Sequence, residues 1–598
     1  YTTLKGGSMQ HTRLSRLLSA CFVVSAASVV AAHFDAPVIG AAHAAKGGIK
    51  GSGKGTGGGG TTGGSTGGST GGSTGGTTGG TTSPPTIPLS SATVVLNAAQ
   101  DVSDSGGNDL AAGRALFRSS SYPESNGGLQ SSSVLLAGIQ DTYSRTINAE
   151  DGSYVDSSGV FHASDRLNWN LPWMKQYGFN AHVIVGQRQP AFIANPASQW
   201  TTQDWATYPD YAYKLVKWVA LQFDTTGFPE TMFEVGNEVD ITQDVRDLWT
   251  LANPAVPQGD NTRYQHYMRV FPVWANAVDR VARENPGRTI RIAGPALGGQ
   301  SLFLTNSFWH ERFVNDVAAG GMRLDALTLH FYGDLLNGWP NVPGSNLRAL
   351  LQRMRSALVA VNRGSTPELV TEYGPSEGSD TYWGHINYSY EGAPWAAVFL
   401  QEALAGTATA GSYLIVRDNF GASTTGSAPV ASFTHIDNGV DYPKPTYNAF
   451  RMFTMMPGTR KAVTLSTLQP DVRALASADA SSAALLVSNY NYRYNYPTDY
   501  TDLTVNQTVV PGLTNLGFTG GVTVERYLID QSTSNVAKYI DGNQPLNFTG
   551  SSLTKVESCS ATVDTTGAVV LPSRVLGPSA VSLWMVRAGV VSGLSVCQ

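Results

Sequence analysis

The sequence predicts a protein of the α/β class: an eight-stranded (β/α)8 TIM barrel with an appended antiparallel β-sandwich. Between residues 179 and 416, short apolar runs alternate with amphipathic helical segments, which is typical of a parallel sheet. At least six strands fall in this region, and the segment before it has room for two more. After residues 443–450 the pattern changes, and residues 470–598 contain short alternating runs, which indicate antiparallel strands.

The amino-terminal residues are expected to be a leader that is removed. Residues 1–8 precede the first methionine and look like extra translated sequence. Arg13 and Arg16 then precede an apolar run at 17–32, and Ala42-His43-Ala44 is a small-residue cleavage site. Residues 1–44 are therefore read as an extension plus a secretory signal, which predicts a secreted protein, extracellular or periplasmic. The apolar run is short for a membrane span. A lipoprotein box is a weaker alternative, because Cys21 stands near the start of that run.

A linker and two domains follow the leader. Residues 45–88 are rich in Gly, Ser and Thr and cannot bury a core, so a flexible tether is expected. The barrel is assigned to 89–455 and the sandwich to 456–598, and a strand near 90–100 is expected to join the sandwich. Cys559 and Cys597 are the cysteines outside the leader. Export favours a disulfide between them, and two free thiols are the alternative.

The barrel elements are read from periodicity. In the first helix, Tyr211, Leu215, Trp218 and Val219 recur at helical spacing. The expected helices span 205–223, 264–284, 308–318, 347–362 and 395–405. The expected strands span 179–186, 231–235, 289–295, 324–332, 368–374 and 412–416.

The sandwich strands are recognised by alternation and turn residues. They are expected at 472–476, 482–487, 521–528, 568–571 and 580–586, with one from the other end of the chain at 93–96.

Composition excludes several classes of function. A net charge of −5 over 598 residues gives no basic surface for nucleic acid. The sequence has no H-E-x-x-H, C-x-x-C or P-loop motif, and no glycine-rich nucleotide fingerprint follows a strand. We therefore expect no metal and no cofactor.

Two strands of the predicted barrel each deliver a glutamate to a loop. The stretch 231–240 contains Gly236-Asn237-Glu238, and the stretch 368–375 contains Thr371-Glu372-Tyr373. Reactive groups in such barrels lie at the carboxyl ends of the strands, so Glu238, His330 and Glu372 are expected near one another. A pair of carboxyl groups is what acid-assisted cleavage of an acetal requires.

The strings Glu234-Val235-Gly236-Asn237-Glu238 and Thr371-Glu372-Tyr373-Gly374 together resemble clan A retaining glycoside hydrolases, most of all families 39, 51 and 79. Three further strings agree with this resemblance: Ala293-Gly294-Pro295-Ala296, Leu329-His330-Phe331-Tyr332 and Pro443-Lys444-Pro445. The resemblance covers residues 143–450. It implies that Glu238, after strand four, is the acid/base and that Glu372, in strand seven, is the nucleophile.

The resemblance also implies binding roles. Asn237 would bind the 2-hydroxyl of the substrate, and His330 and Tyr332 would form hydrogen bonds near the nucleophile. Arg145, near strand two, would keep Glu372 charged. Trp339 and Trp383 are expected to offer rings on which sugars stack.

Each of these residues has an alternative reading. A glutamate after a strand is often a solvated loop residue, and Glu377 competes with Glu372 as the nucleophile. His330 can be a core histidine, Arg145 a structural ion-pair partner, and the tryptophans core residues. Glu234 lies deeper in its strand and is expected to be a structural partner. The run 414–420 has no tryptophan where the clan often places one.

The sequence thus predicts a secreted retaining glycosidase that cleaves β-linked polysaccharides or oligosaccharides. A non-catalytic carbohydrate-binding or adhesion protein is the alternative, and a transglycosylase is a second one among enzymes. Neither the sugar nor an oligomeric state follows from the sequence.

Overall fold

The computed structural model describes most of the chain beyond residue 89. The described residues are 90–104, 110, 115, 119–121, 135, 138, 143–146, 149–150, 152–176, 178–190, 193, 200–241, 261–298, 309–338, 344–376, 386–413, 415–417, 432–437, 440–465, 471–490 and 506–598. All of them belong to the compact unit Ser83–Gln598. The expected leader and linker lie outside the described residues.

Eight strands pair in a closed circle, and every pair in it is parallel. They are β2 (Ser119–Ser121), β3 (Tyr143–Thr146), β6 (Asn180–Val185), β7 (Glu230–Val235), β8 (Thr289–Leu297), β9 (Ala326–Tyr332), β10 (Glu368–Gly374) and β11 (Ala410–Tyr413). Their order around the circle is β10-β11-β2-β3-β6-β7-β8-β9. The carboxyl ends of β3, β7, β9 and β10 therefore open on the same end of one barrel.

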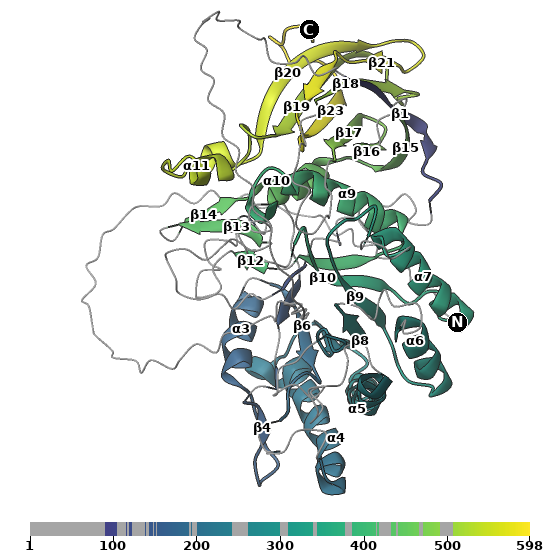
Figure 1. Cartoon of the computed structure of the whole chain (residues 1–598), viewed down its shortest axis with the longest axis vertical. Coiled ribbons are helices and arrows are strands. Elements are labelled where there is room, and N and C mark those ends of the chain that lie inside the picture. Colours follow the sequence, from purple (N-terminus) through teal and green to yellow (C-terminus); the bar gives the residue numbers. More distant parts are fainter. Residues whose placement is uncertain are drawn as a thin grey trace, which may run out of the picture. The chain divides into compact units, whose positions relative to one another are not determined.

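From β3 onward, each barrel strand is followed along the chain by a helix (Figure 1). The helices are α3 (Asp165–Gln176), α4 (Thr202–Lys217), α5 (Asn261–Glu284), α6 (Trp309–Ala319), α7 (Leu347–Ala360), α9 (Gly392–Ala405) and α10 (Pro445–Met455). The α4 helix begins earlier than periodicity suggested, because Thr201 and Asp204 form a capping box. It continues as a π-helical turn at Trp218–Gln222 and a 3-10 turn at Phe223–Thr225.

The barrel core lies mainly between the strands and these helices. Tyr208 and Tyr211 of α4 meet Trp274 of α5 edge to face, and all three side chains are buried. Inside the circle of strands, Met232, Ala293, Ala326 and Leu369 form a separate small cluster. Strand side chains alternate between the two faces, so Glu234 lies on the same face as Met232, two residues further along β7. Polar residues thus occupy the layer of the interior above this apolar one.

The last barrel strand is shorter than expected. The sequence predicted a strand over 412–416, but β11 ends at Tyr413. Residues Ile415–Arg417 form β12, which pairs instead with β13 (Ser432–Asp437) and, through it, with β14 (Val440–Pro443). One apolar run therefore contributes to two sheets.

The appended domain is one continuous ten-stranded sheet rather than two separate sheets. Its strands are β1 (Ser90–Asp101), β15 (Thr459–Leu465), β16 (Val472–Ala478), β17 (Ser482–Asn489), β18 (Gln507–Thr514), β19 (Gly520–Ile529), β20 (Thr554–Val563), β21 (Val569–Val570), β22 (Arg574–Leu576) and β23 (Val581–Ala588). The β1 strand joins the two halves, because it pairs antiparallel with β15 and parallel with β18.

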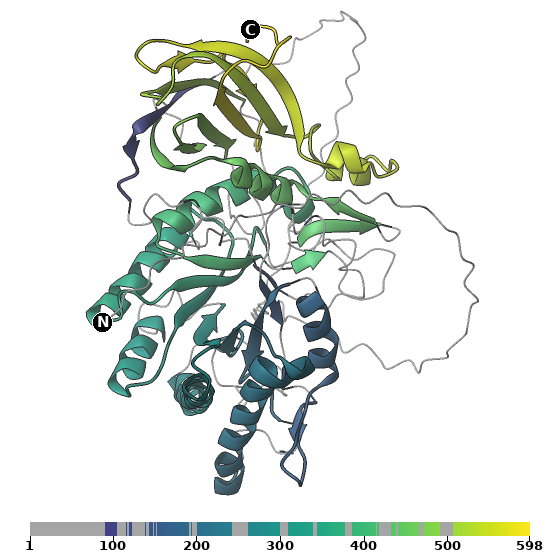
Figure 2. The ribbon, with the colours of Figure 1, turned by 180° about the vertical axis from the view of Figure 1, so that it is seen from behind.

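The ten-stranded sheet curls on itself around its own core (Figure 2). Val94 of β1 and Leu513 of β18 belong to the same buried cluster as Val524 of β19 and Trp584 of β23. These strands lie in different halves of the strand order. The curling therefore encloses apolar side chains much as two stacked sheets would.

Two short elements and a disulfide complete the description. A hairpin of β4 (Tyr154–Val155) and β5 (Phe161–His162) precedes α3, and α11 (Ala537–Asp541) and α12 (Phe548–Ser551) lie between β19 and β20. The predicted disulfide is confirmed: Cys559 and Cys597 are bonded, with an S–S distance of 2.10 Å. Among the described helices, none has the length and apolar character needed to cross a bilayer.

Candidate active site

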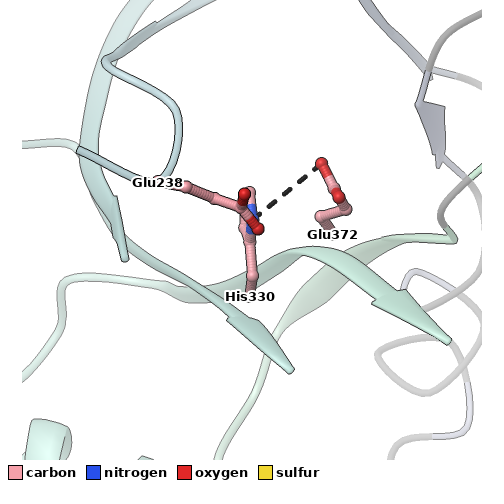
Figure 3. Close-up of side chains that lie close together, drawn as sticks. All are labelled: Glu238, His330 and Glu372. Atoms are coloured by element: carbon pink, nitrogen blue, oxygen red, sulfur yellow. Dashed lines mark hydrogen bonds and ion pairs between the residues drawn. The ribbon is translucent and has the colours of Figure 1, made fainter. Parts of the chain in front are cut away.

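Glu238 and Glu372 meet inside the mouth of the barrel. One carboxylate oxygen of each, together with a ring nitrogen of His330, lie within 4.8 Å of one another. Figure 3 shows the three side chains converging from separate segments of the barrel. All three residues are buried. The structure therefore brings together two carboxyl groups that are far apart in the chain.

The backbone around Glu238 is held in an uncommon conformation. Glu238 has a φ of 50°, in the left-handed region that non-glycine residues rarely adopt. Its N–H donates to the carbonyl of Ala296 at 2.9 Å, which ties it to the carboxyl end of β8. A Cβ added to Gly298 would approach Glu238 Cγ to 2.5 Å. A glycine is thus required at 298 for the side chain of Glu238 to lie where it does.

A register shift in β10 aims Glu372 into the barrel. The pairing of β10 with β9 is interrupted between Val370 and Glu372, which indicates a bulge. The side chains of Thr371 and Glu372 consequently both reach the polar interior, although they are consecutive in a strand. Tyr332 donates its hydroxyl to Glu372 Oε1 at 2.6 Å, and Arg145 Nη1 lies 3.1 Å from Glu372 Oε2.

Arg145 is the hub of this network. Its Nε donates to Glu234 Oε2 at 2.7 Å, its Nη1 to Glu372 Oε2 at 3.1 Å and its Nη2 to Asn237 Oδ1 at 2.8 Å. The side chain is 0% exposed. One planar guanidinium therefore fixes residues from β7, the loop after β7, and β10 at the same time.

Glu234 is the structural partner that the sequence predicted. Its Oε1 accepts a hydrogen bond from the Thr371 hydroxyl at 2.6 Å, and His182 Nε2 lies 3.2 Å from its Oε2. Burial alone would raise the pKa of Glu234, but the Arg145 guanidinium, together with His182 and His330, outweighs burial and holds the pKa well below its usual range. Burial lowers the pKa of His182, so its imidazole is neutral at pH 7. The Arg145–Glu234 pair is therefore the charged centre of the barrel interior.

The tautomer of His330 follows from its two neighbours. Arg145 Nη2 lies 3.2 Å from His330 Nε2, and His330 Nδ1 lies 3.2 Å from Glu238 Oε1. A guanidinium can only donate, so Nε2 must accept. The hydrogen of the neutral ring is then on Nδ1, which donates to Glu238.

The same reasoning bears on metal binding. Glu238, His330 and Glu372 are close enough to offer one ligand atom each to a cation. A metal at this point would need a lone pair on His330 Nδ1, which is the atom that carries the hydrogen. Arg145 also places a positive charge 3.1 Å from Glu372. The donor set thus fits a proton-transfer site better than a metal site.

Asn237 is held on two sides and offers one group to the mouth of the barrel. Its Oδ1 accepts from Arg145, and its backbone N–H donates to Gln187 Oε1 at 2.7 Å. Within the described residues its Nδ2 amide makes no hydrogen bond. Asn237 is also only partly buried. This NH2 group is therefore available to a ligand.

Six of the eight predicted site residues come together: Glu238, Glu372, Asn237, His330, Tyr332 and Arg145. Trp339, Trp383 and the alternative nucleophile Glu377 lie outside the described residues. Reasoning from sequence missed His182, Gln187 and Thr371. A signal was present for His182 and Thr371, since each is a polar residue directly after apolar residues inside a barrel strand.

Comparison with known proteins identifies the fold. No protein-family model matches the sequence, and no curated protein matches it. The GH39 enzyme from Xanthomonas axonopodis pv. citri superposes with a TM-score of 0.61 at 16% identity, covering 83% of this chain and 97% of that one. The chain has the fold of a family 39 glycoside hydrolase.

Two further solved structures agree. A monomeric β-xylosidase from Caulobacter crescentus CB15 has a TM-score of 0.59 at 16% identity, covering 83% of this chain and 99% of that one. A bacterial orthologue of human α-L-iduronidase has a TM-score of 0.58 at 12% identity, covering 84% of each chain. The likeness to family 39 predicted from the sequence is confirmed at the level of the fold. At such low identity the activity has to be argued from the site itself.

Proposed function

We propose that the chain is a retaining glycosidase that hydrolyses β-linked glycans by double displacement, with Glu372 as the nucleophile and Glu238 as the acid/base. The observation that carries the proposal is the approach of their carboxylate oxygens to within 4.8 Å. Retaining enzymes keep the two carboxyl groups about 5–5.5 Å apart, whereas inverting enzymes leave about 6.5–9.5 Å for a water molecule. The separation supports retention.

The surroundings of Glu372 suit a nucleophile. It accepts hydrogen bonds from Tyr332 and Arg145, both of which favour the charged carboxylate. When the Glu372 oxygen attacks the anomeric carbon, its negative charge is lost in a covalent bond to the sugar. Tyr332 and Arg145 keep the attacking oxygens oriented until that bond forms.

The surroundings of Glu238 suit an acid that later becomes a base. The neutral His330 ring donates to Oε1, so the proton to be delivered is best carried by Oε2. Glu238 gives this proton to the departing oxygen as the bond to the anomeric carbon breaks. It then takes a proton from the water that attacks the glycosyl-enzyme, which releases Glu372.

Asn237 supports recognition of the sugar next to the bond that is cleaved. Its free Nδ2 group lies beside the acid and donates to a hydroxyl, consistent with the 2-hydroxyl role that the resemblance implies. A hydrogen bond to the 2-hydroxyl strengthens at the transition state and contributes several kcal/mol in such enzymes.

The substrate and the compartment are part of the proposal. The similar structures include a β-xylosidase and an iduronidase orthologue, so pentosides, hexosides and uronides are the first candidates. The leader read at residues 1–44 supports secretion, and the bond between Cys559 and Cys597 suits an oxidising compartment.

The test is a panel of aryl β-D-xylosides, β-D-glucosides and β-D-glucuronides, with xylan and β-glucan as polymers. Hydrolysis of at least one member is expected. Glu372→Gln should reduce kcat by about four orders of magnitude or more, because the nucleophile is gone. Glu311→Gln, a surface glutamate on α6 that pairs with Arg353, is the matched control and should retain full activity. Turnover by Glu372→Gln at the rate of the wild type would refute the assignment.

The same panel separates the alternatives. A carbohydrate-binding protein would bind a glycan in calorimetry and turn over none of the panel. A transglycosylase would give longer products when an acceptor sugar is added. The charged, buried surroundings of the two glutamates favour hydrolysis over mere binding, since a binding site needs no such pair.

A further inference from the structure

A buried carboxyl lies just outside the network described above. Glu150, four residues beyond the end of β3, is 0% exposed. Its Oε2 accepts the backbone N–H groups of Gln187 and Arg188 at 2.8 and 2.9 Å. Its Oε1 accepts the hydroxyl of Tyr208 at 3.3 Å. Glu150 therefore fastens the segment that follows β6.

A buried carboxyl is a costly way to stabilise a loop. In the described part of the chain no cation pairs with Glu150, and its partners are backbone N–H groups and one hydroxyl. Burial raises the pKa of Glu150 to about 8, despite the backbone N–H groups of Arg188 and Gln187, which lower it. A residue kept at such a desolvation cost in the interior is a candidate for a role in the site.

The segment that Glu150 holds, residues 187–188, contacts the backbone next to the proposed acid, Glu238. Gln187 is buried, and its Oε1 accepts the backbone N–H of Asn237 at 2.7 Å. Asn237 precedes Glu238 and is bonded to Arg145 through its side chain. The chain of contacts thus runs from Glu150 through Gln187 to the peptide that carries the acid.

The far side of Glu150 is anchored on the helices. Tyr208 of α4 donates to Glu150 and accepts from Trp274 Nε1 of α5 at 2.8 Å. Gly186, with a φ of 68°, packs so closely that an added Cβ would lie 3.1 Å from Trp274 Nε1. Rigid helices therefore fix the position of Glu150, and Glu150 in turn fixes Gln187.

We propose that Glu150 is a positioning residue that acts through Gln187 to hold Asn237 and Glu238 in place for proton delivery to the leaving group. This inference rests on the proposed glycosidase function. It assigns Glu150 no contact with the substrate.

The test uses the dependence of the rate on the leaving group. Proton delivery matters for an alkyl or sugar leaving group and little for dinitrophenolate, which departs without a proton. Glu150→Ala is expected to lower kcat/KM at least about tenfold for the poor leaving group and less than about threefold for the dinitrophenyl glycoside. A variant that merely populates less folded protein would lower both rates equally.

Three companion variants sharpen this test. Glu150→Gln keeps an acceptor for the two N–H groups and should restore the ratio of the two rates to within about threefold of the wild type. Gln187→Ala should shift the ratio as Glu150→Ala does, and the double variant should be little worse than either single one. Glu368→Ala removes an equally buried carboxyl at the opposite end of the barrel and should leave the ratio unchanged.

Hydrogen exchange gives a readout that does not depend on turnover. Glu150→Ala should speed exchange of the amides in 185–190 and 231–238, and Glu368→Ala should not. Faster exchange with an altered rate ratio supports the inference. Unchanged exchange, or faster exchange with an unaltered ratio, overturns it.

If the wild type cleaves no glycoside at all, the proposed function fails and the catalytic role of Glu150 fails with it. The exchange data would then show a purely structural contact.

Discussion

Arg145 Nη1 lies 3.1 Å from Glu372 Oε2, although 227 residues separate the two in the chain. The same guanidinium holds Glu234 and Asn237, so one side chain links the nucleophile segment to the acid segment. The geometry of the proposed reaction therefore depends on a residue that needs no contact with the substrate.

Arg145→Lys is expected to lower kcat/KM at least about 100-fold, because a single ammonium cannot replace four hydrogen bonds directed from three nitrogens of a planar group. Arg145→Ala should also destabilise the barrel by about 3–5 kcal/mol, since it leaves Glu234 buried and without a cation. Kinetics and thermal melts check both effects. Arg353→Lys, which alters a part-buried pair on α7, is the control. Activity of Arg145→Lys within threefold of the wild type would contradict the proposal that Arg145 holds the two glutamate segments in place.

Tyr332→Phe should lower kcat/KM about 10- to 100-fold, because it removes the 2.6 Å hydrogen bond to Glu372 Oε1 and leaves the packing of the ring intact. The matched control is Tyr264→Phe, which removes a 2.5 Å hydrogen bond to Asp316 away from the site. The two variants should melt at similar temperatures and differ in rate. Equal rates would show that Tyr332 is only structural.

Cys597→Ser should destabilise the curled sheet without changing the chemistry. The bond to Cys559 closes a loop with a sequence separation of 38. The chain-entropy model puts the stabilisation from such a loop at about 4 kcal/mol. Calorimetry should show a lower melting temperature and kcat/KM at 25 °C within about twofold of the wild type. A reductant should lower the melting temperature of the wild type and leave that of the variant unchanged. A wild type whose melting temperature does not respond to the reductant would contradict a stabilising role for the disulfide.

Glu368 should make stability fall as the pH rises. Burial raises its pKa to about 7, more than Thr407 and Arg355 lower it, against 4.5 as the reference value. The folded state therefore holds the proton more tightly, and stability is lost between pH 4.5 and 7. The loss amounts to about 3 kcal/mol above that window. Glu368→Gln should gain stability relative to the wild type over this range in melts at several pH values. Parallel profiles would contradict the assignment.

The elements with strong local signals were predictable from the sequence. The barrel strands around Val183, Phe233 and Leu329 are largely apolar runs, and Glu238 and Glu372 stand at or near the carboxyl ends of β7 and β10. The Asn-Glu pair, the Thr-Glu-Tyr string and the His-Phe-Tyr string contain five of the six site residues that come together, and Arg145 is the sixth.

The features that could not be predicted from the sequence depend on contacts between distant segments. No local feature shows that Ile415 leaves the barrel sheet for another one. The strand near 90–100 joins the appended sheet as expected, but its place between β15 and β18 was not predicted. The bulge before Glu372 is likewise a matter of pairing with β9. The role of Gln187 was invisible, because a lone glutamine after a strand has no pattern. Its meaning appears only when the N–H of Asn237 is seen to point at it.

The most direct measurement is covalent trapping on the best substrate of the panel. A 2-deoxy-2-fluoro glycoside with a good leaving group slows breakdown of the glycosyl-enzyme and lets it accumulate. The structure predicts that mass spectrometry of the digested protein will find one sugar attached to Glu372, and that NMR of the product will show retained configuration. A label on another residue, or an inverted product, would contradict the pairing of Glu238 and Glu372.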